Sequence, residues 1–145
     1  MSWLGPSNDG SVLEAARRMG PYLIVFAGAG VGGMLRHGLN GVSLRLFGPD
    51  LPIGTPIINV VGSFLMGLIG GWFLVRGGSS PGWRLFLTTG VLGGFTTFST
   101  FSLEAALLWE RGALVQAAVY IIGSVGLGVL ALFGGLALAR AFGPV

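Results

Sequence analysis

The sequence predicts an all-α membrane protein with four transmembrane helices, the third of them broken near mid-membrane. Of the 145 residues, 52% are hydrophobic and only 9% are charged, whereas soluble domains carry about 25% charged residues. A helix needs roughly 20 apolar residues to cross a bilayer, and four stretches qualify, at about 22–39, 55–75, 85–109 and 114–138. The third stretch holds three glycines within five residues, which disfavours a continuous helix.

The connections between these stretches, at 46–52, 76–82 and 110–112, contain glycine, and the first two also contain proline. This is turn chemistry, and from such short connections we expect consecutive helices to be antiparallel neighbours. Residues 1–20 form a polar N-terminal leader ahead of a four-span domain at 21–145. Arg17 and Arg18 precede the first apolar run, as in a signal peptide. No small-residue cleavage site follows, so we favour an uncleaved, partly helical leader.

Composition excludes several classes of function. The chain has no cysteine, which rules out disulfides, thiolate metal sites and cysteine nucleophiles. Its eight basic residues are all arginines, scattered at the ends of apolar runs, so no nucleic-acid-binding face is predicted. One histidine and few carboxylates do not supply a nucleophile, a base and an orienting group, and no enzyme is expected. Arginines divide weakly between the two sides, which leaves a single orientation and an antiparallel dimer both open.

Polar residues in the second span mark one helical stripe. Thr55, Asn59 and Ser63 recur every four residues, a spacing that places them on the same face. The amide of Asn59 needs hydrogen-bond partners inside the membrane. It either joins two helices or offers its NH2 group to a passing ligand, and the sequence leaves both roles open.

In the third span we expect a break between Gly93 and Thr97, where glycines meet β-branched threonines. A break inside the membrane frees backbone groups, which are tolerated only where protein, water or an ion satisfies them. Half-helix ends at mid-membrane are a known way to build an ion site. Carbonyl oxygens suit a hard cation such as Na+, and N-terminal amides suit an anion. The alternative is a kinked helix whose hydroxyls bond back to the preceding turn.

Aromatic and polar residues nearby suggest a route for an anion. We expect Phe95, Phe98 and Phe101 to share one face. Such a stripe usually serves as core or lipid contact, but the positive edge of a phenyl ring also suits an anion path. In the fourth span, Tyr120 and Ser124 lie four apart.

Two charged residues lie near span ends. Arg36 ends the first span and Glu104 lies late in the third. Either side chain can extend to the membrane interface. Arg36 could equally lie in a vestibule, where its charge would attract anions.

Three segments carry a family resemblance: Gly33–Arg36, Gly54–Phe64 and Gly90–Glu104, the last containing the string Thr-Thr-Phe-Ser-Thr-Phe after paired glycines. They closely resemble the signatures of CrcB/Fluc fluoride channels, and the resemblance extends from about residue 22 to 140. It implies an antiparallel, dual-topology homodimer with two pores and a structural Na+ at its centre. The implied activity is fluoride-selective, passive export of cytoplasmic fluoride across the bacterial inner membrane.

The resemblance also implies roles for individual residues. The backbone carbonyls of Gly93 and Thr96 would hold Na+, and Arg36 and Glu104 would line the vestibules. The fluoride pathway would include Asn59, Phe98, Phe101, Thr55, Tyr120, Ser124, Ser99 and Thr100. One departure is Gly128, where many members of the family have Ser or Thr.

Two rival interpretations remain. A proton-coupled transporter resembling the small multidrug resistance family would need a carboxylate deep in the first span. Residues 22–39 contain none, and Glu104 lies near the end of the third span. A purely structural membrane subunit would show unchanged ion flux after substitution of Asn59 or Phe98.

Overall fold

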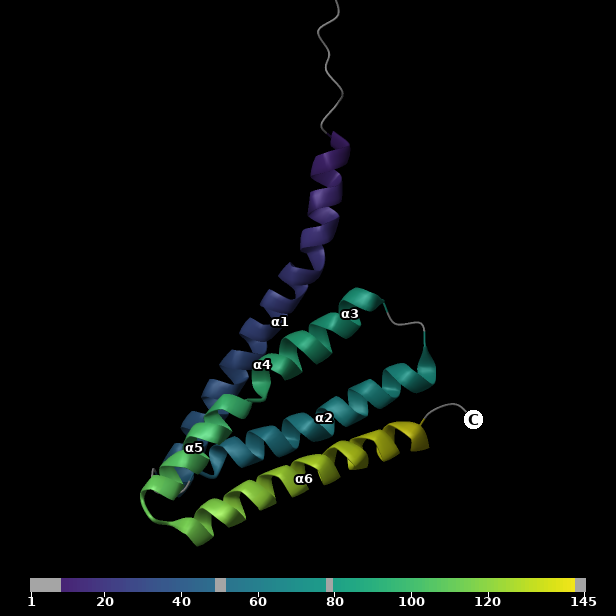
Figure 1. Ribbon diagram of the computed structural model, residues 1–145. Coiled ribbons are helices and arrows are strands. Elements are labelled where there is room, and N and C mark those ends of the chain that lie inside the picture. The colour runs from purple at the N-terminus through teal and green to yellow at the C-terminus, as the bar shows by residue number, and fades with distance from the viewer. Residues whose placement is uncertain (1–8, 49–51, 78–79, 143–145) are drawn as a thin grey trace, which may run out of the picture.

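The computed structural model of the chain describes residues 9–48, 52–77 and 80–142. The first two spans are α1 (Asp9–Phe47) and α2 (Gly54–Arg76). The third consists of α3 (Pro81–Leu85), the π-helix η1 (Phe86–Leu92), α4 (Gly93–Phe95) and α5 (Phe98–Glu110), and the fourth is α6 (Leu114–Ala141). Within this described part, four helical stretches are long and apolar enough to cross a membrane. The predicted all-helical, four-span organisation with a bent third span is therefore confirmed (Figure 1).

The first helix is longer than its apolar stretch of 22–39. It begins at Asp9, so residues 9–20 of the expected leader continue directly into the span, while residues 1–8 lie outside the described residues. An ion pair of 2.6 Å between Arg18 and Glu14, one helical turn apart, supports this extension. Figure 1 shows the N-terminal part of α1 projecting beyond the other helices. The helix ends where Gly48 adopts a φ of 76°, a conformation that favours glycine.

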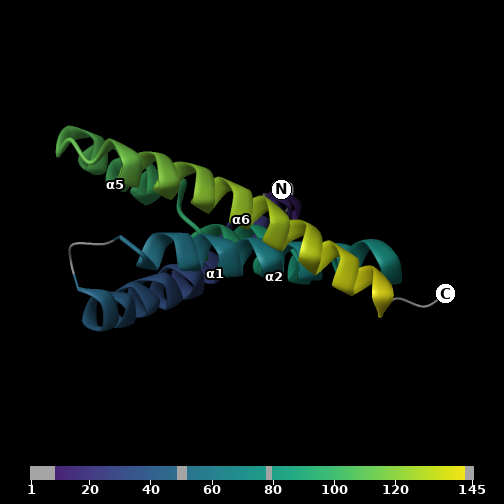
Figure 2. The same ribbon diagram turned by 90° about the horizontal axis from the view of Figure 1, so that it is seen from below.

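The closest packing joins alternate helices rather than consecutive ones. α1 runs parallel to the first half of the third span, and α2 runs parallel to α6 (Figures 1 and 2). Glycines permit this approach: a methyl group added at Gly28 would lie 2.8 Å from Cα of Gly90, and one at Gly71 would lie 2.7 Å from Cβ of Ala139. Our expectation of side-by-side consecutive helices was incomplete, because short turns fix direction, whereas small residues decide which backbones can touch.

The third span loses helical geometry at two residues. Helix α4 ends at Phe95, Thr96 has φ −80° and ψ 156°, and Thr97 has φ −149° and ψ 117°. Helical backbone resumes at Phe98. These are extended conformations, so the predicted break between Gly93 and Thr97 is confirmed and the alternative of a merely kinked helix is excluded.

Candidate functional site

The break is fixed from outside by one side chain on α2. Asn59 Oδ1 accepts the backbone N–H of Thr97 at 2.8 Å, and Asn59 Nδ2 donates to the Thr97 carbonyl at 3.0 Å. Of the two roles left open for Asn59, helix-to-helix bonding is thus present. The amide nitrogen carries two hydrogens, and Thr97 takes one of them.

The threonines at the break are also paired. Thr97 Oγ1 accepts the backbone N–H of Thr100 at 3.3 Å and thereby caps α5. The same hydroxyl lies 3.0 Å from Thr100 Oγ1 and 3.3 Å from Ser99 Oγ. Thr96 Oγ1 donates to the carbonyl of Leu92 at 3.0 Å. The hydroxyls of residues 97, 99 and 100 therefore form one small network at the start of α5.

Because of these bonds, the backbone carbonyls of Gly93 and Thr96, which we expect to hold a cation, lack their usual helical donors. In an α-helix each N–H donates to the carbonyl four residues earlier. The natural donor to Gly93, the Thr97 N–H, is taken by Asn59 Oδ1. The natural donor to Thr96, the Thr100 N–H, is taken by Thr97 Oγ1. Both oxygens are left without these helical partners, as a cation site built from carbonyls requires.

The phenyl rings separate at the break. Phe95 is buried beside Gly62, before the break. Phe98 is 78% exposed and Phe101 only 8% exposed, with their ring centroids 5.6 Å apart. The expectation that all three share one face was wrong, because the spacing rule holds only within a continuous helix and the break lies between Phe95 and Phe98.

Glu104 joins α5 to two other helices. Its Oε1 accepts from Thr55 Oγ1 at 2.9 Å, and its Oε2 accepts from Tyr120 Oη at 2.6 Å. The Tyr120 ring stacks on Phe101, with centroids 5.4 Å apart and planes 18° apart. Two residues predicted for the pathway, Thr55 and Tyr120, therefore bond to one partly buried carboxylate, and Phe101 stacks on the second of them.

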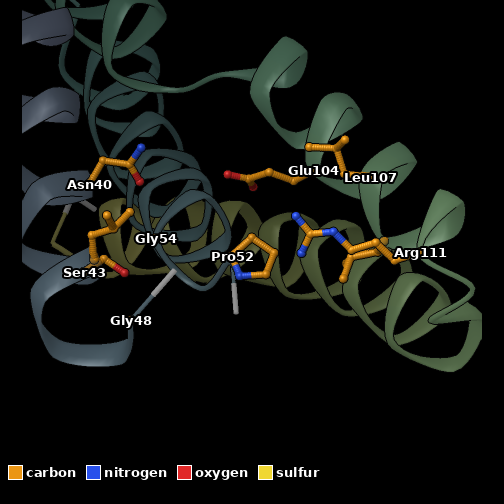
Figure 3. Close-up of a pocket in the computed structure, with 10 residues that line it drawn as sticks. Asn40, Ser43, Gly48, Pro52, Gly54, Glu104, Leu107 and Arg111 are labelled. Carbon is orange, nitrogen blue, oxygen red and sulfur yellow. The ribbon is translucent and has the colours of Figure 1, made fainter. Parts of the chain in front are cut away.

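A cavity of about 150 Å³ reaches this carboxylate from one end of the molecule. In Figure 3, Asn40 and Ser43 of α1 lie on one side of it, and Glu104 of α5 and Arg111 just after α5 lie on the other. Glu104 thus lines this cavity, whereas Arg36 is partly buried on α1 and does not line it. Sequence reasoning missed Asn40 and Ser43 because the apolar stretch ended at residue 39 although α1 continues to Phe47. It also missed Arg111, a charged residue in the turn after α5, where such residues are common.

Some of the other predicted residues line two further cavities, whereas Gly93, Ser99 and Thr100 line none of the three. Asn59, Ser63, Thr96 and Phe98 help to line one of about 260 Å³. Tyr120 and Ser124 help to line a largely apolar groove of about 430 Å³ along α6. Ser124 Oγ is buried and has no hydrogen-bond partner among the described residues. Buried hydroxyls without a partner are uncommon, so Ser124 Oγ needs a hydrogen-bond partner such as water, an ion or a second chain.

Comparison with known proteins gives one consistent result. The family described as CrcB-like protein, Camphor Resistance (CrcB), matches residues 23–136. A relative from Methylobacterium nodulans, named fluoride-specific ion channel FluC, is 61% identical over 121 residues, which cover 83% of this chain and 97% of the relative.

Two further relatives have similar names. FluC of Rhodopseudomonas palustris is 59% identical over 83% of this chain and 97% of its own length. FluC 2 of Nitrobacter hamburgensis is 56% identical over 82% and 96%. These relatives are named as ion channels and not as enzymes, in agreement with the expectation that the chain is not an enzyme. The four-span fold, the interrupted third span and these matches together show that the chain belongs to the CrcB-like family.

Proposed function

We propose that the chain forms a fluoride-selective channel that lets cytoplasmic fluoride leave passively through the bacterial inner membrane. The observation that carries this proposal is the interrupted third span, where two carbonyls that lack their helical donors lie beside a hydroxyl network and two phenyl rings. The names of relatives that match along nearly their whole length support the choice of ion.

The pathway residues suit a small, strongly hydrated anion. Dehydration of fluoride is tolerable only if donors replace its water at close range, and the site offers amide, hydroxyl and ring-edge groups. Donor groups come from Asn59, Ser124, Ser99, Thr100, Phe98 and Phe101. Thr55 and Tyr120 line the pathway with hydroxyls that already donate to Glu104. Glu104 holds two of these hydroxyls in place through hydrogen bonds of 2.6 and 2.9 Å. The cavity at Glu104 serves as a vestibule, and a narrow passage excludes larger halides.

The working unit is an antiparallel homodimer with two pores. Phe98 is 78% exposed on the single chain, and Gly93 at the break is exposed as well. A second copy facing this surface would cover the ring and complete the lining of each pathway. The weak division of arginines between the two sides supports insertion in both orientations.

A Na+ ion at the dimer centre fits the carbonyl oxygens of Gly93 and Thr96, two from each subunit. Oxygen ligands suit this hard cation, and the described residues contain no cluster of three or more His, Cys, Asp or Glu side chains that offers another metal site. When bound, the ion supplies a fixed positive charge that holds the two subunits together. The chain's own part is to keep these carbonyls free of helical donors.

Ion efflux from liposomes tests the proposal. Purified protein should release fluoride rapidly without ATP or a proton gradient, and should release chloride at the rate of protein-free liposomes. Phe98→Leu should slow fluoride efflux. Phe133→Leu, at an exposed ring on α6, should not. Chloride efflux as fast as fluoride efflux would show that the channel is not fluoride-selective, and dependence on a proton gradient would favour the transporter alternative.

A further inference from the structure

The amide of Asn59 makes an unusual pair of contacts. It bonds to both backbone groups of one residue, accepting the Thr97 N–H at 2.8 Å and donating to the Thr97 carbonyl at 3.0 Å. A neighbouring β-strand pairs with an extended residue in the same two-bonded way. Thr97 is extended and buried, so Asn59 supplies, from a helix, the pairing that an isolated extended residue lacks.

This pairing decides whether the Gly93 carbonyl is free. Were the third span to continue as a helix, the Thr97 N–H would return to Gly93. A buried N–H without any partner is costly, so removal of Asn59 would favour that return or a shift of the break. The capping of α5 by Thr97 Oγ1 depends on the same extended residue, and with it the freedom of the Thr96 carbonyl.

The surrounding surface of α2 is shaped for the break as well. Gly62 lies one turn after Asn59, and a methyl group there would collide with Cγ2 of Thr96 and lie 3.1 Å from the Phe95 ring. The face of α2 therefore combines an amide that bonds to Thr97 with a bare backbone that accommodates Thr96. Both features serve the two non-helical residues.

We propose that Asn59 is a positioning residue whose amide holds the helix break open and thereby keeps the carbonyls of Gly93 and Thr96 ready for a cation. It acts on the cation site through Thr97. The inference rests on the Na+ site of the proposed function and gives Asn59 a duty separate from contact with fluoride.

The test measures Na+ dependence rather than flux alone. Wild type, Asn59→Leu and Asn59→Ser are purified, and their thermal unfolding is followed in detergent while NaCl replaces N-methyl-D-glucamine chloride. Loss of residues that orient metal ligands typically weakens metal affinity about 10- to 100-fold. We expect both variants to need at least about tenfold more Na+ for half-maximal stabilisation, and high Na+ to restore part of their fluoride flux. Faster hydrogen exchange at the Thr97 amide should accompany the change.

The control is Ser63→Ala, on the same face of α2 and beside the same cavity, which should keep the Na+ dependence of wild type. Serine is small and polar, so Asn59→Ser still allows the Na+ dependence to be measured if Asn59→Leu does not fold. Variants that lose flux while keeping wild-type Na+ dependence would overturn the positioning role and leave the Na+ site standing. A wild-type protein indifferent to Na+ would overturn both.

Discussion

Replacing Gly28 by alanine should push α1 away from the first half of the third span. A methyl group at this position would lie 2.7 Å from the Phe86 carbonyl oxygen, 2.8 Å from Cα of Gly90 and 3.0 Å from the Val91 nitrogen. All three are backbone atoms and cannot rotate aside. Non-bonded carbon atoms rest about 3.5–4.0 Å apart, so the two helices must separate by roughly 1 Å.

The size of the effect follows from a matched control. Overpacking of this kind costs about 1–3 kcal/mol. Gly30, two residues further along α1, has no atom within 4 Å of an added methyl group. Both substitutions share the gain in helix propensity of about 1 kcal/mol on exchanging glycine for alanine. Gly28→Ala should therefore be less stable than Gly30→Ala by about 1–3 kcal/mol.

Reversible unfolding in mixed detergent micelles, followed by tryptophan fluorescence, measures this difference. Fluoride flux gives a second result, because α1 also contacts α4 through Ala29 and Gly94, so its displacement reaches the break. Gly28→Ala should conduct more slowly than Gly30→Ala. Equal stability of the two variants, within about 0.5 kcal/mol, would refute the close helix contact from which the magnitude is worked.

Three other substitutions probe the site. Tyr120→Phe removes a charge-assisted hydrogen bond to Glu104 worth about 1.5–3 kcal/mol. It should lower the free energy of unfolding and slow fluoride flux. Tyr22→Phe, at a residue that is 72% exposed, should change neither. Thr97→Val removes the cap of α5 and should cost about 1 kcal/mol, measured by unfolding, with faster amide exchange in the first turn of α5; unchanged exchange there would contradict the cap. Arg111→Gln should slow fluoride entry at low ionic strength and have little effect at 1 M salt, where the screening length is about 3 Å; flux that is equally slow at both would argue against electrostatic attraction.

The sequence was sufficient to predict the spans and the break. The thickness of the bilayer alone sets the length of apolar sequence that a spanning helix needs. The four spans could therefore be predicted without knowledge of how the helices pack. The clustered glycines followed by threonines likewise carry a local signal, and the structure interrupts the helix at Thr96 and Thr97.

What could not be predicted depends on contacts between segments far apart in the chain. The bonding of Asn59 to Thr97 joins residues 38 positions apart, and neither segment carries a sequence pattern that indicates the other as its partner. The cavity residues Asn40, Ser43 and Arg111 were missed because polar residues at helix ends are common and carry no signal of a shared space. The single face assumed for Phe95, Phe98 and Phe101 failed because periodicity cannot be carried across an interruption.

Pairing between alternate helices has a consequence for biogenesis. As the ribosome delivers the spans in order, the surface of α1 that carries Gly28 and Gly32 lacks its partner until residues 81–95 enter the bilayer. The matching surface of α2 waits still longer, for α6. Individual spans insert before they associate, so this chain cannot mature hairpin by hairpin. A nascent chain arrested after residue 76 contains two helices that both lack their main packing partners, and membrane quality control must retain or degrade this form.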